Sequence, residues 1–450
     1  MRKFLFILMF LIVTLMGCNN NSNQTVTSSD ASVAAFSFVT DTLYPGLTAA
    51  TYKVEQRTDT GLIYNSDSLA FGTRLDSVIP RVTYNATPAS AYFILPSDTI
   101  LSTGTDTMNF SQDPIYLHVK ASDLEHEKWY RIMLTVHHVD PDLYVWTLLN
   151  PQVFNSQGSE VKALVVGEDI VLFVNNGFHT QLFQSADGII WKQLAEPMGL
   201  PSQCRVRDIL QHHDTLYYAD RETLYSTTDL INWNTNSYAA EEYSLVNMLV
   251  VFDDKAWGIL QDKSTLQLML GYVQGGKLLP AEDIEGLSGN VLPESFPVND
   301  FAALSFAASS ERPRAMVVGG RALDGTALNT RWNLERAIPQ GYRIKDFSIE
   351  QPSFRSLTGM SIVQYDGHLV MFGGIDNDLE WRSDMLFSDD EGMNWYIPDT
   401  AHNRLPDTYR TRQRQSAVVD AQQNIYLIGG QSSTETFSDV YRGQLNSINW

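Results

Sequence analysis

Short runs of alternating apolar and polar residues are the main pattern of the chain between residues 35 and 139. From Tyr130 to Val136, the residues Tyr, Ile, Leu and Val stand at every second position, which is the period of a strand with one buried face. The run 115–120 alternates in the same way, and the polar stretch 122–128 predicts a hairpin between the two. Further runs of this kind lie at 35–39, 62–64, 78–84 and 92–95.

Turns rich in Asp, Ser, Thr, Gly and Pro separate these runs. Several short strands at this spacing within about 105 residues favour a small immunoglobulin-like β-sandwich over residues 35–139. The Cys-Trp-Cys core signature of true immunoglobulin domains is absent. The prediction therefore depends on the spacing of the strands alone.

The remaining chain, residues 142–450, repeats a hairpin unit of an apolar strand, a tight turn and a second apolar strand. For example, Met360–Tyr365 turns at Asp366-Gly367 into Leu369–Phe372. Intervals of 39 to 58 residues separate the copies, the range of β-propeller blades. We predict an all-β chain whose C-terminal part is a propeller with six blades favoured, or seven if one long copy contains two. The copies begin near residues 161, 206, 245, 301, 359 and 414.

One further strand precedes the first copy. Trp146 lies 15 residues before Val161, as Trp191 lies 15 residues before Val206, so the segment 143–149 has the position of a fourth strand. We expect this segment to complete the last blade and close the ring.

Two turn motifs support the propeller. The second strands of three copies end in a double glycine that resembles the kelch repeat. The segment Ser388–Trp395 matches the S-x-D-x-G-x-x-W Asp-box of sialidase-like propellers, with weaker copies at 185–191 and 226–233. An Asp carboxylate can accept backbone N–H bonds in such a turn while the Trp packs between sheets, so we assign these residues structural roles. The glycines are Gly319, Gly320, Gly373, Gly374, Gly429 and Gly430. The Asp-box residues are Ser185, Asp187, Gly188, Trp191, Ser226, Asp229, Trp233, Ser388, Asp390, Gly392 and Trp395.

The N-terminus has the pattern of an export signal. Arg2 and Lys3 precede an apolar run, 4–16, that is too short to span a bilayer. The run ends in Leu-Met-Gly-Cys at Cys18, which resembles the lipobox of bacterial lipoproteins. The resemblance implies a signal peptide over residues 1–17, a lipid on Cys18 and a flexible tether over 18–34. The mature chain would be anchored to a membrane through this lipid without spanning it.

Composition narrows the classes of partner. The chain of 450 residues contains 52 Asp and Glu against 31 Lys and Arg, for a net charge of −21. Such a charge repels phosphate backbones, so nucleic acid is excluded as a general partner. With only Cys18 and Cys204, neither a disulfide scaffold nor a cysteine-rich zinc module is expected.

No catalytic, metal or cofactor site is predicted. The arginine triad and Tyr-Glu pair of sialidases cannot be assigned, and nucleotide-binding and hydrolase motifs are absent. The adjacent histidines at 137–138 and 212–213 should point to opposite faces of a strand, so we expect neither pair to bind one metal ion. The acidic residues Asp376, Asp378 and Glu380 could hold Ca²⁺ through oxygen ligands, but without a longer ligand pattern they are interpreted as a solvated loop.

Six arginines precede the first strands of their copies, where the chain enters a propeller near its central channel. In so acidic a chain, a cluster there could bind a carboxylate or sulfate through forked hydrogen bonds. The alternative is that these side chains pair with nearby Asp and Glu. The six are Arg205, Arg207, Arg355, Arg410, Arg412 and Arg414.

Over nearly its whole length, the chain resembles Bacteroidota lipoproteins of unknown function, built as lipobox, tether, immunoglobulin-like domain and kelch or Asp-box propeller. The resemblance implies export and lipid anchoring to the outer membrane, on its periplasmic or cell-surface face. Our first hypothesis is a binding module for a glycan or protein, because propeller loops gather around one funnel. The alternatives are a sialidase-like glycoside hydrolase and a non-catalytic scaffold subunit of an outer-membrane complex.

Overall fold

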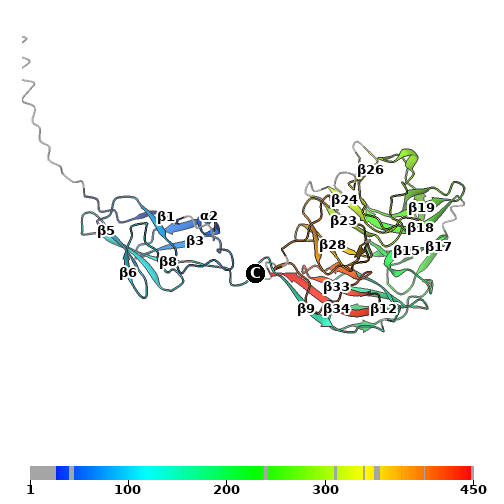
Figure 1. Ribbon diagram of the computed structural model, residues 1–450, viewed down its shortest axis with the longest axis horizontal. Helices are drawn as coiled ribbons and strands as arrows, with labels where there is room; N and C mark the ends of the chain where they lie inside the picture. Colours follow the sequence, from blue (N-terminus) through cyan, green and yellow to red (C-terminus); the bar gives the residue numbers. More distant parts are fainter. Residues whose placement is uncertain are drawn as a thin grey trace, which may run out of the picture. The chain divides into compact units, whose positions relative to one another are not determined.

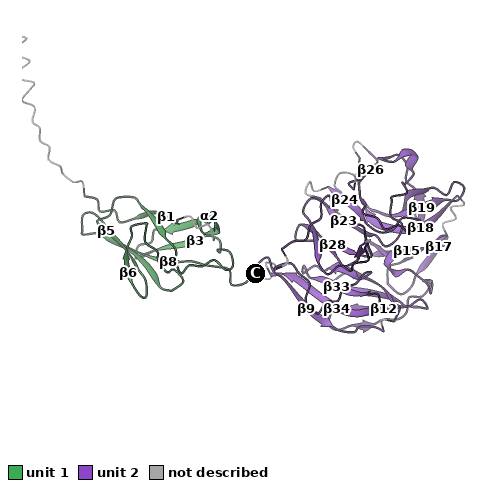
Figure 2. Cartoon of the chain, viewed as in Figure 1, with its two compact units in different colours: residues 1–140 green, residues 141–450 purple. Residues whose placement is uncertain are grey.

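The computed structural model describes residues 27–39, 45–155, 157–237, 242–308, 312–337, 340–348, 355–376, 378–399 and 401–446. The chain forms two compact units, Met1–Asp140 (unit 1) and Pro141–Trp450 (unit 2), shown in Figure 2. The predicted signal peptide, Cys18 and the first part of the predicted tether lie outside the described residues. Within the described ranges, no helix has the length and apolar character needed to cross a bilayer.

Unit 1 contains a two-stranded and a six-stranded sheet. The larger sheet has the order β2-β3-β8-β7-β5-β6, with β3 and β8 parallel. The predicted hairpin is confirmed, because β7 pairs antiparallel with β8 over the whole length of β7. A short helix, α2 (Pro45–Ala49), lies between β1 and β2. The strands are β1 (Val33–Phe38), β2 (Tyr52–Glu55), β3 (Thr60–Asn65), β4 (Pro80–Tyr84), β5 (Ser90–Ile94), β6 (Thr99–Leu101), β7 (Ile115–Lys120) and β8 (Glu127–Met133).

An aromatic cluster joins the two sheets of unit 1. Phe38 on β1 meets Phe110 edge to face at 5.4 Å between ring centroids, and Phe110 meets Phe93 on β5 at 5.7 Å. All three rings are buried. The sequence pattern did not predict β2 and β6, because every side chain of Tyr52–Glu55 is partly or fully exposed and Thr99–Leu101 is only three residues long.

Unit 2 contains six sheets of three to five strands in its described residues (Figure 1). Within each sheet, strands that follow one another in the chain pair antiparallel. The first three sheets are β10 (Glu160–Val166), β11 (Asp169–Asn175), β12 (Thr180–Ser185) and β13 (Lys192–Gln193); β14 (Leu210–His212), β15 (Thr215–Ala219), β16 (Thr223–Thr227) and β17 (Asn234–Ser237); and β18 (Tyr243–Phe252), β19 (Lys255–Asp262), β20 (Leu268–Gln274) and β21 (Lys277–Pro280).

The other three sheets follow the same order along the chain. The fourth also carries β22, which pairs parallel with β26. They are β23 (Ala302–Ala307), β24 (Pro313–Val318), β25 (Arg331–Arg336), β26 (Tyr342–Asp346) and β22 (Ile284–Glu285); β28 (Ser361–Tyr365), β29 (His368–Phe372) and β31 (Met385–Ser388); and β32 (Ser416–Val419), β33 (Ile425–Gln431), β34 (Thr436–Leu445) and β9 (Tyr144–Asn150). The small pair β27 (Leu357–Thr358) and β30 (Ile375–Asp376) and the 3₁₀ turns η1 (Val206–Asp208) and η2 (Ser288–Asn290) complete the unit's described elements.

A ring of contacts joins neighbouring sheets and runs β10, η1, β18, β23, β28, β32 and back to β10. Five of these elements are first strands, and the second sheet takes part through η1, just before its first strand β14. Apolar layers fill the space between successive sheets. On β11, Ile170 and Leu172 pack toward the sixth sheet, while Val171 and Phe173 pack toward the second. Because each middle strand is covered on both faces, it reads as a continuous apolar run in the sequence.

The predicted ring closure is confirmed. β9 pairs antiparallel with β34, so a strand from the start of unit 2 forms the edge of its last sheet. Trp146 of β9 lies over Gly443 of β34, where an added Cβ would come within 2.5 Å of the indole ring. Glycine is therefore needed at this position for the aromatic ring to lie flat on the neighbouring strand.

The double glycines end the second strands of the fourth, fifth and sixth sheets. All six of them have positive φ values between 57° and 101°. At Gly319 a Cβ would lie 2.4 Å from the carbonyl oxygen of Leu357, and at Gly373 it would lie 2.5 Å from that of Arg412. These glycines let one sheet's strand end approach the backbone of the next sheet.

The Asp-box segments form turns that their carboxylates stabilise. Asp187 Oδ1 accepts the backbone N–H groups of Ile189 and Ile190 at 2.8 and 3.0 Å, and Trp191 Nε1 donates to Gly188 O at 2.9 Å. The segment 388–395 repeats this arrangement: Asp390 accepts the N–H of Asn394 at 2.7 Å, and Trp395 donates to Gly392.

In the Asp-box copy at 226–233, Ser226 was wrongly predicted as the hydroxyl residue. The hydroxyl that bonds Asp229 belongs to Thr227, at 3.0 Å, and not to Ser226 as the sequence alignment assumed. In all three turns the hydroxyl stands two residues before the aspartate. Trp233 keeps its predicted role and donates to the carbonyl of Leu230 at 3.2 Å.

Candidate functional site

A cavity of about 390 Å³ lies where the first strands of all six sheets meet. Its wall combines apolar, polar and charged side chains. Backbone segments from all six sheets contribute to the lining. We call this cavity the central pocket. Its charged lining residues are Lys162, Arg205, Arg207, Asp208, Asp300 and Arg414.

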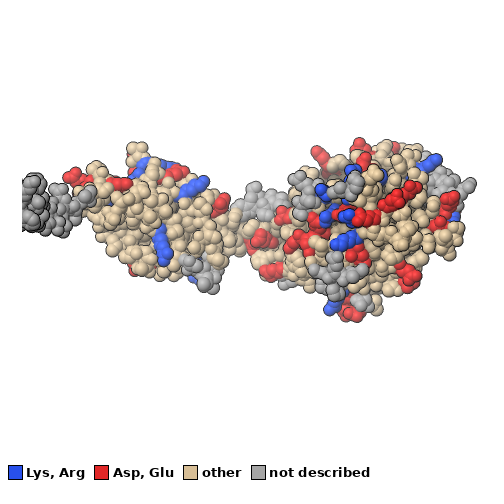
Figure 3. Space-filling view, turned by 90° about the horizontal axis from the view of Figure 1, so that it is seen from above, with Lys and Arg blue, Asp and Glu red and all other residues tan. Residues whose placement is uncertain are grey.

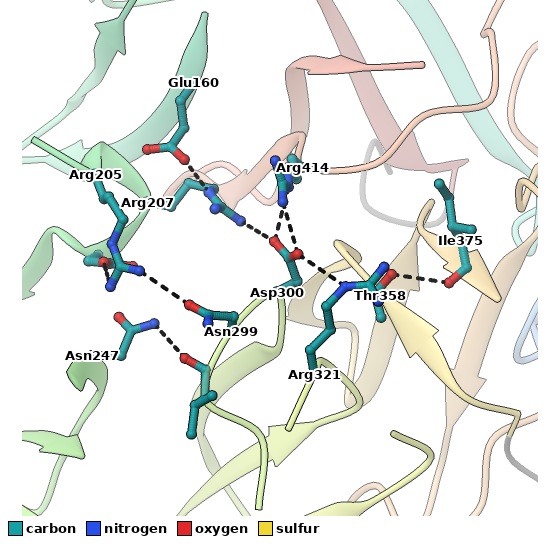
Figure 4. A network of polar contacts seen from close by, with 12 residues as sticks. Glu160, Arg205, Arg207, Asn247, Asn299, Asp300, Arg321, Thr358, Ile375 and Arg414 are labelled. Atoms are coloured by element: carbon teal, nitrogen blue, oxygen red, sulfur yellow. Dashed lines mark hydrogen bonds and ion pairs between the residues drawn. The ribbon is translucent and has the colours of Figure 1, made fainter. Parts of the chain in front are cut away.

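Asp300 is the centre of a charge network in the pocket (Figure 4). Its side chain is 8% exposed and receives three guanidinium groups from different sheets. Arg414 donates from Nε and Nη2 at 3.0 and 2.9 Å, and Arg207 donates from Nη1 at 2.9 Å. Arg321 Nε lies 3.6 Å from Oδ2. One carboxylate thus holds three cationic side chains close together.

Two further ion pairs extend the network. Arg207 Nε lies 2.7 Å from Glu160, and Arg205 lies 2.6 Å from Asp208. Arg205 also donates to Asn299 at 3.2 Å. The network therefore contains four arginines and three carboxylates. With all seven groups ionised, its net charge is positive even when Lys162 is not counted, although the whole chain has a net charge of −21. Figure 3 shows basic and acidic side chains interleaved on one face of unit 2.

Burial shifts the pKa values of several groups in the pocket. Burial raises the pKa of Asp208 to about 6, against the opposing charges of Arg205 and Arg207. Burial also acts to raise the pKa of Asp300, but the hydrogen bond from Arg414 and the charge of Arg207 outweigh it and hold that pKa below its usual value. Desolvation lowers the pKa of Lys162. The carboxyl groups of Asp208 and Asp300, which line the same pocket, therefore have shifted pKa values of opposite direction.

The structure brings together only half of the six predicted arginines. Arg205, Arg207 and Arg414 line the pocket. Arg412 is instead buried in the sixth sheet, where it pairs with Asp439 and stacks on Phe437 at 3.9 Å.

The other two arginines do not line the pocket: Arg410 forms an exposed pair with Glu435, and the exposed Arg355 lies near the buried Asp376. Predicting one cluster was therefore wrong for Arg355, Arg410 and Arg412. The reason for the split within 410–414 is the left-handed backbone at Arg414, with φ of 57°, which turns this side chain away from the direction of Arg412.

Sequence reasoning missed Glu160, Lys162, Asn299, Asp300 and Arg321. A usable signal was present, because Glu160 and Asp300 stand directly before the first strands near 161 and 301 and Arg321 directly follows a double glycine. Acidic residues thus share with the arginines the positions just before first strands, and they supply the partners of those arginines.

Two other predicted groups have clear structural roles. Asp376 Oδ1 accepts the N–H groups of Asp378 and Glu380 at 3.0 and 2.9 Å, so it caps a turn in the acidic loop. Cys204 is free and buried, and burial raises the pKa of its thiol. A buried thiol of this kind is a poor nucleophile.

The expectation that His212 and His213 point to opposite faces was wrong, although His213 is a turn residue and exposed. Both Nε2 atoms lie 2.8 Å from the same oxygen, Asp254 Oδ1. The strand alternation that should separate the two rings ends at His212, because His213 has a left-handed backbone with φ of 52°. Adjacent histidines at a hairpin tip can therefore face one group.

Comparison with known proteins gives a family match. Residues 140–450 match the family described as the DUF6242 beta propeller domain, and residues 19–134 match the N-terminal domain of the same domain of unknown function. One solved structure, titled "Structure of YjhT", is similar over 65% of this chain and 96% of that chain, with 10% sequence identity and a TM-score of 0.47. No curated protein matches the sequence.

Proposed function

The chain belongs to the DUF6242 beta propeller family, and from that premise we propose that it is a lipid-anchored binding module whose central pocket binds the carboxylate or sulfate group of an acidic glycan or protein. Catalysis is not required for this role. The proposal has three parts, which are the anchor, the propeller ring and the anion site.

The anchor is supported by the sequence of the N-terminus. The basic residues, the short apolar run and Cys18 have the order of a lipoprotein signal. We propose export, lipidation of Cys18 and attachment to the outer membrane, with unit 1 as an immunoglobulin-like spacer. Labelling with a radioactive fatty acid tests this part, since a Cys18→Ser variant should lose the label.

The ring is proposed to have six blades. The support for this count is that six sheets follow one another in the chain and that a closed cycle of contacts joins them, through the first strands of five sheets and through η1 just before the first strand of the second. A ring of this kind gathers loops from every blade around one axis. A ligand in the central pocket would meet side chains from several sheets at once.

The observation that carries the anion site is the convergence of Arg207, Arg321 and Arg414 on Asp300. Each guanidinium has five N–H donors in a planar fork, so donors remain after the bonds to Asp300 are made. An incoming carboxylate or sulfate would share these groups with Asp300 and balance the excess positive charge. The residues that line the pocket include neither Trp nor Tyr, so recognition would depend on charge rather than on stacking.

The test uses a chain beginning at residue 19, without the lipid. Sulfated and uronic-acid oligosaccharides, their neutral counterparts and acidic peptides are compared by calorimetry. Arg207→Gln and Arg414→Gln should each weaken binding of the acidic probe about 10- to 100-fold, because a hydrogen bond to a charged group contributes about 1.5–3 kcal/mol.

Arg355→Gln and Arg410→Gln are the matched controls, because both arginine side chains are exposed and neither lines the pocket. Unchanged affinity in the pocket variants would overturn the anion site, as would equal binding of the neutral probes. Binding of the peptides alone would identify a protein as the partner. No binding of any probe would favour the scaffold alternative.

A second candidate, glycoside hydrolysis, is favoured by one observation. Asp208, with its pKa raised to about 6, shares the pocket with Asp300, whose pKa is lowered. Such a split is typical of an acid and a base in glycosidases. Release of reducing sugar from an acidic glycan, and its loss in Asp208→Asn, would support hydrolysis; binding without turnover would exclude it for the glycans tested.

A further inference from the structure

Two hairpin tips of neighbouring sheets meet away from the central pocket. The β14–β15 hairpin turns directly after His212, and the β18–β19 hairpin turns at Asp253 and Asp254. His213, Asp253 and Asp254 all have left-handed backbones, with φ values of 52°, 52° and 60°. Asp254 faces the two histidines of the other tip, whereas Asp253 bonds Arg336 and Tyr342.

The three side chains at this meeting point have the donor set of a metal site. His212 Nε2 and His213 Nε2 each lie 2.8 Å from Asp254 Oδ1, and all three candidate ligand atoms lie within 4.8 Å of one another. The two imidazole rings are perpendicular, with an interplanar angle of 78° and centroids 4.5 Å apart. Their nitrogens therefore approach one point from different directions.

We propose that His212, His213 and Asp254 bind a zinc ion through two imidazole nitrogens and one carboxylate oxygen, with a fourth position open to water. Zinc favours four ligands of this kind in a tetrahedron, with metal–ligand distances of about 2.0–2.2 Å. Ligand atoms at those distances are about 3.4 Å apart. Each nitrogen must therefore move about 0.6 Å away from Asp254 Oδ1, and the two nitrogens, which lie within 4.8 Å of each other, must reach the same spacing. Rotation of two exposed side chains, 68% and 76% accessible in His213 and Asp254, can supply this movement.

The second imidazole distinguishes this group from ordinary histidine–aspartate pairs. His126 and His368 each bond one aspartate, and such pairs need no metal. In the part of the chain that the structure describes, only the 212–213–254 group gathers three candidate ligands.

The surroundings leave space for a bound molecule. A cavity of about 310 Å³ adjoins the site, and its wall includes His212, Asp254, Tyr217 and Lys255. The Lys255 ammonium lies over the rings of Tyr272 and Tyr342, at 4.0 and 4.9 Å from their centroids. Its charge is thus held by aromatic faces, and it does not occupy the position of the ion.

The experiment titrates zinc into the metal-free chain from residue 19 by calorimetry and follows cobalt binding by visible absorption. We expect one zinc per chain and the strong d–d bands of a tetrahedral cobalt site. His213→Ala and Asp254→Ala should weaken zinc binding by at least about 100-fold, because a site with two protein ligands is incomplete. His368→Ala is the matched control, since it removes an exposed histidine from a single aspartate pair.

Thermal melting with and without zinc provides a second readout. Zinc should raise the melting temperature of the parent and of His368→Ala by mass action, and leave that of His213→Ala unchanged. Absence of zinc binding in the parent would overturn the proposal. Equal binding in His213→Ala, or an equal loss in His368→Ala, would also overturn it.

Discussion

Replacing Arg412 should destabilise unit 2 strongly, although the sequence suggested a role in ligand binding. The side chain is 1% exposed. Its Nε donates to the carbonyl of Arg410 at 2.9 Å and its Nη1 to that of Gly429 at 3.0 Å, while Nη2 bonds Asp439 at 3.1 Å. Arg412→Ala leaves Asp439 as a nearly buried, unpaired charge, which is expected to cost about 3–5 kcal/mol.

This loss converts into a measurable shift in melting temperature. The entropy of unfolding is about 2.1 cal/mol/K per residue, or about 0.65 kcal/mol/K for a unit of about 310 residues. A loss of about 4 kcal/mol should therefore lower the melting temperature of unit 2 by about 6 °C, measured by differential scanning calorimetry.

The matched control is Arg410→Ala, two residues away. Arg410 is 60% exposed in its pair with Glu435, so its loss should cost less than about 1 kcal/mol. The double variant Arg412→Met with Asp439→Leu should melt above Arg412→Ala, because no unpaired charge remains. Equal melting temperatures of Arg412→Ala and Arg410→Ala would refute the reasoning, and so would a double variant no more stable than Arg412→Ala.

Two other predictions concern the strand ends and the pocket. Gly319→Ala should lower the free energy of unfolding by about 3 kcal/mol, because a Cβ there would collide with the Leu357 carbonyl. Gly367→Ala is the control, because a Cβ there has nothing within 4 Å, and it should lower the free energy of unfolding by only about 1 kcal/mol. Equal losses of the two variants in urea denaturation would contradict the collision at Gly319. The pKa of Asp208 is about 6 in the folded chain against an ordinary 3.8, so ionisation favours the unfolded chain and stability falls as pH rises from about 4 to about 6. Asp208→Asn should therefore gain up to about 3 kcal/mol over the parent across this window, and a gap independent of pH would show that burial does not shift this carboxyl.

The hairpins of unit 2 could be predicted because their physical cause is local. Each middle strand is covered by both neighbouring sheets, so runs such as Ile170–Val174 are apolar throughout and end at a turn. The position of β9 could be predicted for a similar reason, because Trp146 stands at the spacing of a fourth strand. Short or exposed strands such as Thr99–Leu101 leave no such pattern, since their pairing depends on a neighbour that is already in place.

The candidate site could be predicted only in part. The position of arginines before first strands correctly indicated Arg205, Arg207 and Arg414, but the same position describes Arg412, which is buried. The difference is set by the backbone at Arg414, and a left-handed φ at a residue other than glycine has no reliable sequence signal. The histidine pair was misjudged for the same reason, because His213 leaves the strand conformation on which the argument depended.

The pairing of β9 with β34 also fixes the order in which the molecule can assemble. Most strand pairs of unit 2 are hairpins that form from neighbouring residues, but Tyr144 meets Leu445 across some 300 residues. Closing a loop of that length costs conformational entropy, and this cost comes before the contacts between β9 and β34 can stabilise the folded chain. The first five sheets can therefore form from local hairpins during synthesis, whereas β9 stays unpaired until β34 has been synthesised. The β9–β34 pairing is expected to form slowly, and until it forms the unpaired edge of β9 is open to pairing with other chains.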